Sequence, residues 1–199
     1  MSELIKIIKH FITRDVIFII GGSIVILSFM YKFNRISITN LPTAYYILGA
    51  GISYVLGYTI QDAFCLLPFV KIKTRLKYNT FIQKLYKIFV GEDGKWELLK
   101  TINLDDARRE IDKQGGERIQ AQLERIITLK QIGMTIGSCG LISSIFLILR
   151  AIEYQTEFDV WLASCVFLVS IILILLGWIK MAQAAHYYTN FYLNLKRED

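Results

Sequence analysis

The chain has 199 residues, of which 54% are hydrophobic, and its mean hydropathy is +0.42. Its apolar residues are gathered in long blocks, a pattern that excludes an ordinary soluble domain and indicates an integral membrane protein. The net charge of +6 comes from lysines and arginines that lie between and beside these blocks, so we expect no direct contact with nucleic acid.

A basic amphipathic segment precedes the first apolar block. In residues 2–14, aliphatic residues recur at helical spacing on the face opposite Lys6 and Lys9, which is typical of a helix lying among lipid headgroups. The first membrane span is predicted at residues 15–31. No small-residue cleavage pattern follows this block, so we interpret it as a retained span rather than a signal peptide.

The second apolar block begins after Pro42 and extends over residues 43–70. Because about 20 residues suffice to cross the hydrocarbon core, this length predicts a span that tilts or continues past the interface. Gln61 and Asp62 then lie near the inner surface, where a carboxylate is tolerated at little cost. One helical turn deeper, they would be costly intramembrane polar groups of the kind usually linked to function. The sequence is compatible with both depths.

Residues 71–130 form the largest polar segment, and they contain too few aliphatic residues for an independent core. Amphipathic spacing predicts one helix before a turn at residues 91–94 and a second helical stretch from about Asp105. After Gly115-Gly116, a further helical stretch leads directly into the third span. We expect these helices to pack on one another, on the membrane surface or on a partner.

The third span is predicted at residues 131–151 and the fourth at residues 160–178, with a short acidic connector between them. The helix of the fourth span is expected to continue into the aromatic-rich C-terminal extension. Arg150 ends the third span, where its side chain can reach the interface and pair with Glu153 or Glu157.

The basic residues predict the orientation of the chain in the membrane. Of its 23 lysines and arginines, 20 lie in the N-terminal tail, the middle segment and the C-terminal end, and three lie in the two short connectors. The positive-inside rule therefore places both termini and the middle segment in the cytoplasm of a bacterial inner (plasma) membrane, next to anionic lipids.

These blocks predict an all-α fold with four transmembrane helices and a helical cytoplasmic insert between the second and third spans. Residues 1–70 hold the amphipathic N-terminal helix and the first two spans. Residues 71–130 form the insert, and residues 131–199 hold the third and fourth spans with the cytoplasmic C-terminal extension.

Small residues at helical spacing mark one face of the second span and one face of the third. In lipid, such faces hold helices together through close van der Waals contact. The pattern is compatible with packing between spans of one chain and with packing between protomers of a homo-oligomer, for which we expect a tetramer. The first span has only a shorter patch at residues 21–23. The residues of the two faces are Gly49, Ser53, Gly57, Gly133, Gly137, Gly140 and Ser144.

No motif for catalysis or cofactor binding is present: the chain lacks GxSxG, HExxH, P-loop and dinucleotide-binding patterns. Three cysteines without a CxxC pair and two widely separated histidines predict no metal site. The acidic pair at residues 105–106, followed by Arg108 and Arg109, is typical of a helix start rather than of catalytic carboxylates. We therefore expect a protein that is not an enzyme.

Two functions fit these observations. The first is a non-enzymatic oligomeric sensor or scaffold that couples a membrane event to a cytosolic protein partner, which would contact Arg108, Arg109 and Arg118. The second is a channel or pore-forming effector that perturbs the membrane. An assembly with a continuous central opening would favour the second function, and a plugged or lipid-filled centre the first.

The order of these segments resembles the membrane component of the bacterial Kiwa anti-phage defence system. The resemblance covers the whole chain and rests on its layout: two apolar blocks, the basic helical insert at residues 71–130, and two further apolar blocks. It implies a homo-oligomer in the bacterial inner membrane that senses phage-induced disturbance and recruits a cytosolic effector. It assigns no role to any single residue.

Overall fold

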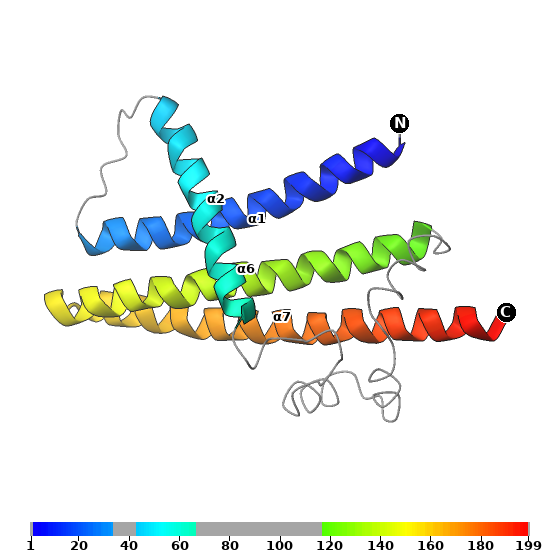
Figure 1. Ribbon diagram of the computed structural model, residues 1–199. Helices are drawn as coiled ribbons and strands as arrows, with labels where there is room; N and C mark the ends of the chain where they lie inside the picture. The colour runs from blue at the N-terminus through cyan, green and yellow to red at the C-terminus, as the bar shows by residue number, and fades with distance from the viewer. Residues whose placement is uncertain (1, 34–42, 67–116, 199) are drawn as a thin grey trace. The chain divides into compact units, whose positions relative to one another are not determined.

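The computed structural model describes residues 2–33, 43–66 and 117–198, and these residues are helical apart from short turns. The helices are α1 (Ser2–Lys32), α2 (Thr43–Leu66), α6 (Glu117–Tyr154) and α7 (Glu157–Glu198), as Figure 1 shows. The all-helical expectation is confirmed for this part of the chain. Of the predicted insert, only the stretch from Glu117 onward is described.

Among the residues that the structure describes, three helices are long and apolar enough to cross a membrane. Their candidate spans are Thr13–Lys32 in α1, Ile119–Tyr154 in α6 and Glu157–Met181 in α7. These correspond to the predicted first, third and fourth spans, and they confirm a multi-pass membrane protein.

Helix α2 is not among the three candidate spans. Its 24 residues extend about 36 Å, which is enough to cross a hydrocarbon core of about 30 Å. Glycines and tyrosines recur along it, and Gln61 and Asp62 lie in its last turns. The fourth span therefore stays a prediction.

Helix α1 runs without a break from Ser2 to Lys32. The amphipathic segment and the first span, which the sequence analysis treats as separate parts, thus form a single helix of 31 residues. Residues 2–32 contain no proline, and the glycines at positions 21 and 22 lie in the middle of the apolar part, away from the expected boundary near Asp15. The sequence therefore offers no helix breaker at that boundary.

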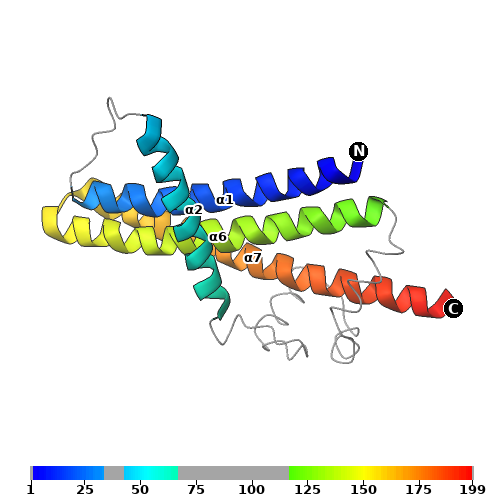
Figure 2. The ribbon, with the colours of Figure 1, turned by 45° about the horizontal axis from the view of Figure 1, so that its top comes forward.

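The chain divides into two compact units, residues 1–66 with 131–175, and residues 67–130 with 176–199. In the first unit, α1 runs parallel to α6: Gly21 lies beside Thr135, and Phe29 packs edge-on against Phe146. Segment 157–175 of α7 runs antiparallel to α6, and α2 crosses α1 at a steep angle in both views (Figures 1 and 2).

In the second unit, the N-terminal part of α6 pairs with the C-terminal part of α7. Leu123 and Ala184 are buried, and the Tyr187 hydroxyl donates to Gln122 Oε1 at 2.5 Å. The expectation that the last helix continues beyond residue 178 is confirmed, since α7 has 42 residues and a length of about 63 Å.

Two residues, Gln155 and Thr156, connect α6 to α7. Gln155 has a φ of 51°, and its N–H donates to the carbonyl of Ala151, so it ends α6 in the left-handed conformation. Thr156 Oγ1 accepts from the backbone N–H of Asp159 at 3.3 Å and donates to the Asp159 carboxylate at 2.5 Å. Thr156 therefore caps the N-terminus of α7 through the N3 backbone N–H, and its hydroxyl also holds the Asp159 carboxylate.

Because only glycine adopts the left-handed conformation without steric cost, Gln155→Gly is expected to stabilise the protein. The gain in unfolding free energy is up to about 1 kcal/mol, since glycine also has more freedom in the unfolded chain. The unfolding midpoint in detergent measures this change. Gln155→Val, with a β-branched side chain at the same position, is the control and should lower the midpoint; a midpoint that falls with glycine would contradict the prediction.

Candidate functional site

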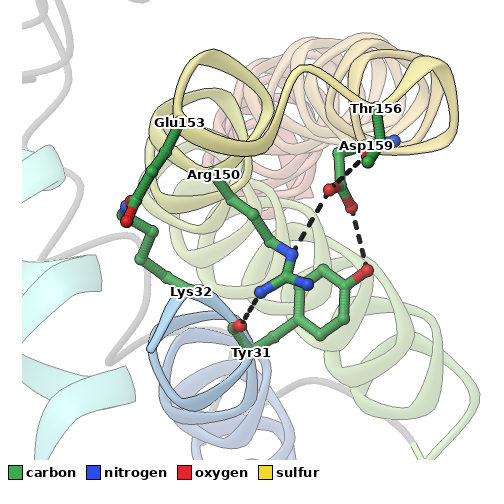
Figure 3. Close-up of polar contacts among 6 residues, drawn as sticks. All are labelled: Tyr31, Lys32, Arg150, Glu153, Thr156 and Asp159. Atoms are coloured by element: carbon green, nitrogen blue, oxygen red, sulfur yellow. Dashed lines mark hydrogen bonds and ion pairs between the residues drawn. The ribbon is translucent and has the colours of Figure 1, made fainter. Parts of the chain in front are cut away.

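Six polar or charged residues gather where the C-terminal ends of α1 and α6 meet the N-terminal end of α7 (Figure 3). We call this group the Arg150 cluster. α1 contributes two of its members, α6 two, the connector one and α7 one. They are Tyr31, Lys32, Arg150, Glu153, Thr156 and Asp159.

Arg150 lies at the centre of the cluster and contacts all three helices. One guanidinium nitrogen donates to the backbone carbonyl of Tyr31 at 2.5 Å, and Nε lies 3.3 Å from Asp159 Oδ2. The guanidinium also stacks over two rings, with its carbon 3.9 Å from the centroid of Tyr31 and 4.7 Å from that of Tyr154. Such cation–π contacts add to an ion pair when the group is largely removed from water.

Asp159 is only 2% exposed, and its carboxylate has a partner on every neighbouring element. It accepts from the Tyr31 hydroxyl at 2.8 Å and from Thr156 Oγ1 at 2.5 Å, and it forms the ion pair with Arg150. A buried carboxylate without such partners would cost several kcal/mol. Asp159 therefore joins α1, the connector and α6 to the start of α7.

A second ion pair lies at the edge of the cluster. Lys32 pairs with Glu153, whose side chain is 54% exposed. Because exposed pairs contribute about 0–1 kcal/mol, this contact adds little to stability by itself.

The chemistry of the cluster is structural. It contains no cysteine or histidine, and its carboxylate and guanidinium groups are engaged with each other and with hydroxyl and carbonyl groups. In the described part of the chain, no group of three histidine, cysteine, aspartate or glutamate residues is placed to hold a metal ion. The arrangement fastens three helix ends together.

The prediction that Arg150 pairs with Glu153 or Glu157 is wrong. Arg150 pairs with Asp159, and Glu153 pairs with Lys32. The reason is the hydrogen bond from the Thr156 hydroxyl, which together with that from Tyr31 holds the Asp159 carboxylate at the helix junction. Composition alone assigns Asp159 to an acidic connector, so sequence analysis missed its role. The T-x-x-D spacing from Thr156 is the signal that identifies it.

The small-residue face of the second span packs partly inside the chain. Ser53 is buried, and its hydroxyl accepts from the Ser23 hydroxyl at 3.1 Å. A Cβ added to Gly57 would meet the backbone of Phe18, whereas one added to Gly49 would meet nothing within 4 Å. Hence Ser53 and Gly57 pack against α1, and Gly49, on the same face of α2, has an open Cβ position.

The small-residue face of the third span is buried throughout, at Gly133, Gly137, Gly140 and Ser144. A Cβ added to Gly137 would lie 2.8 Å from the Ile174 side chain and 3.0 Å from the Ser170 carbonyl oxygen. A Cβ added to Gly140 would meet the Ser170 hydroxyl. For Gly137 and Gly140, the structure gives packing against α7 of the same chain.

The patch at residues 21–23 of the first span is shorter than the other two faces, yet it makes the closest helix contact. A Cβ added to Gly22 would overlap the backbone carbonyl of Ser53, and one added to Gly21 would lie 2.9 Å from Thr135. Because adjacent residues lie on different faces of a helix, Gly22 allows α1 to approach α2 closely, and Gly21 allows it to approach α6.

The remaining candidates lie apart from the cluster. Gln61 is half-buried and accepts a hydrogen bond from the Thr135 hydroxyl on α6, while Asp62 is exposed. Arg118 lies in the first turn of α6. Arg108 and Arg109 lie outside the described residues.

The chain matches no family model, no curated protein and no solved structure.

Proposed function

We propose that this protein is a non-enzymatic, oligomeric sensor and scaffold of the bacterial inner membrane, which couples a membrane event to a cytosolic partner. The observation that carries the proposal is the Arg150 cluster, which fastens α1 to the α6–α7 hairpin through a buried ion pair. A disturbance that separates these helix ends would have to break that pair. Anti-phage defence is the setting that we propose from the layout of the chain.

The direction of the helices supports the proposed four-span topology. Tyr31 of α1 lies beside Arg150 of α6, and Phe29 lies beside Phe146, so the two helices cross the membrane in the same direction. The chain between them must then return across the bilayer, and α2 is the apolar helix that the structure describes there. With such a return, both termini and the insert would lie on one side, and the positive-inside rule supports the cytoplasmic side for them.

Helix continuity supports coupling across the bilayer. α6 has 38 residues and a length of about 57 Å, and α7 is longer, whereas the hydrocarbon core is about 30 Å thick. Each helix begins or ends next to the Arg150 cluster and continues without a break beyond the length needed to cross. A shift of either helix at the cluster would therefore be carried along its axis toward the partner-binding segment.

The buried polar side chains support a scaffold rather than a pore within one chain. Ser138 donates to Met134 O, Ser143 to Cys139 O, and Ser170 to Val166 O. Each of these hydroxyls donates its hydrogen bond to a backbone carbonyl of its own helix. In the described core of one chain, they therefore do not line a path for water or ions. A channel would need several copies around a common opening.

The outward face of α2 supports association between copies. A Cβ added to Gly51 would meet nothing within 4 Å, and Ile47, Leu48 and Val55 are exposed on the same side of α2. This face leaves room for close approach of a second helix. We propose it as the contact of the homo-oligomer, with a tetramer as the expected state.

The test compares two substitutions that remove one positive charge each. Cells that express the chain with its genomic neighbours are challenged with phage, and plating efficiency is measured for Arg150→Gln and Lys32→Gln. Arg150→Gln is expected to reduce any protection against the phage at least tenfold, because it removes the buried ion pair. Lys32→Gln is expected to leave the protection unchanged. Membrane levels of both variants are compared by immunoblot.

Two outcomes would contradict the proposal. One is equal protection by wild type and Arg150→Gln at equal membrane levels. The other is ion conductance by the purified wild-type protein in planar bilayers, which would favour the pore-forming alternative.

A further inference from the structure

Two lysines lie at the same level of the helix pair in the second unit. The hydrogen bond between Tyr187 and Gln122 joins α6 to α7 there, and the two helices run antiparallel. Along α6, Lys130 follows Gln122 by eight residues; along α7, Lys180 precedes Tyr187 by seven. At 1.5 Å per residue, both lysines are about 10–12 Å from that hydrogen bond, in the same direction along the pair. The two side chains therefore start at nearly the same height.

This height is a boundary of the hydrocarbon core. Lys130 directly precedes the apolar block at residues 131–151, whose 21 residues extend about 32 Å as a helix, close to the core thickness of about 30 Å. Lys180 is the last residue but one of the candidate span Glu157–Met181. It follows Trp178, a residue type enriched at membrane interfaces. Both lysines thus lie where lipid headgroups begin.

Both lysines are half-buried, whereas Arg125 in the same part of α6 is exposed. Lys130 follows the buried Leu123 by seven residues, about two helical turns, so the two residues share one face of α6. A charged group that is partly removed from water needs a partner to offset the loss of hydration.

Within residues 2–33, 43–66 and 117–198, neither lysine forms an ion pair with a carboxylate. The Lys180 ammonium donates to Gln183 Oε1 at 2.9 Å, and this amide oxygen is a neutral acceptor. Two positive charges at one height of the helix pair therefore form a site for an anion.

A phospholipid brings an anion to this depth of the membrane. The headgroup of phosphatidylethanolamine carries its own ammonium group and is neutral overall, whereas that of phosphatidylglycerol keeps the negative charge of its phosphate. Basic sites between membrane helices on the cytoplasmic side bind such anionic headgroups. We propose that Lys130 and Lys180 together bind the phosphate of one phosphatidylglycerol molecule. This inference deepens the proposed function, on whose cytoplasmic orientation the choice of leaflet rests, by naming a lipid that the α6–α7 pair would read.

The experiment uses the full-length protein in nanodiscs made of equal amounts of phosphatidylcholine and phosphatidylglycerol. Native mass spectrometry counts the lipids of each kind that stay bound when the disc is removed. Lys130→Gln and Lys180→Gln each remove one charge of the site. Arg125→Gln is the matched control, since it removes one exposed positive charge from the same part of α6. Lys130→Arg keeps the charge and controls for packing.

Wild type is expected to retain several times more phosphatidylglycerol than phosphatidylcholine. Each lysine-to-glutamine change should lower this ratio at least threefold, whereas Arg125→Gln and Lys130→Arg should leave it within about twofold of wild type. Equal retention of the two lipids by wild type would overturn the proposal, as would equal losses in Lys130→Gln and Arg125→Gln.

Two further measurements separate other anions from the lipid. Loss of the bound phosphatidylglycerol on adding inorganic phosphate, but not chloride at matched ionic strength, would assign the lysines to a soluble phosphate. A Lys130→Gln variant that lowers the unfolding midpoint equally in discs with and without phosphatidylglycerol would assign them to a carboxylate of the chain. Either result would overturn the proposal. Because lipid retention is measured without phage, this inference and the proposed function can fail independently.

Discussion

Asp159→Asn is expected to lower the free energy of unfolding by about 3 kcal/mol, the largest effect of any single polar substitution in the described helices. The change keeps the shape of the side chain and removes its charge. Arg150, whose side chain is only 14% exposed, then loses the carboxylate that lies 3.3 Å from its Nε. Removing one partner of a buried ion pair typically costs about 3–5 kcal/mol.

Glu153→Gln is the matched control for this prediction. It is also a carboxylate-to-amide change in the Arg150 cluster, but its pair with Lys32 is exposed on the glutamate side. The expected loss is below about 1 kcal/mol. Unfolding free energies in mixed detergent micelles measure both variants. Equal losses for the two variants would show that the Arg150–Asp159 pair does not fasten the helices.

A double-mutant cycle separates the ion pair from its surroundings. Arg150→Gln and Asp159→Asn are each expected to be destabilising, and the double variant is expected to lose less than the sum of both. A coupling energy above about 1 kcal/mol would agree with the 3.3 Å contact between Arg150 and Asp159. Additive losses would place the stabilisation in the hydroxyl and carbonyl contacts instead.

The sequence predicts the spans well because hydropathy and length are properties of contiguous residues. The candidate spans of α1, α6 and α7 lie where the apolar blocks are, and the continuation of α7 beyond Trp178 follows from unbroken helical composition. The amphipathic segment at residues 2–14 and the first span form one continuous helix, since amphipathicity reports which face is polar and not whether the helix bends.

The contacts of the site were harder to predict, because they join residues far apart in sequence. Tyr31 and Asp159 are 128 positions apart, and no local pattern pairs them. The spacing of glycines showed that some face packs closely, yet it could not distinguish Gly49, which is open, from Gly57, which meets Phe18. That difference depends on where α1 crosses α2.

Gly22→Leu is expected to displace α2 from α1. A Cβ at this position would overlap the backbone of Ser53, and backbone cannot move aside as a flexible side chain can. A disulfide between Ser23→Cys and Ser53→Cys reports the contact, since the two serine hydroxyl oxygens lie 3.1 Å apart. The native cysteines are first replaced by alanine. We expect Gly22→Leu to lower the crosslink yield at least fivefold.

Gly49→Leu is the matched control, because a Cβ at this position of α2 would meet nothing within 4 Å. Its crosslink yield should equal that of the parent protein. The oligomer mass in native lipid gives a second readout: if the outward face of α2 joins copies, Gly51→Leu lowers the mass while the crosslink within the chain persists. Loss of the crosslink with Gly49→Leu would mean that α2 meets α1 through a different face. An unchanged crosslink with Gly22→Leu would show that the close approach of Gly22 to Ser53 does not hold the two helices together.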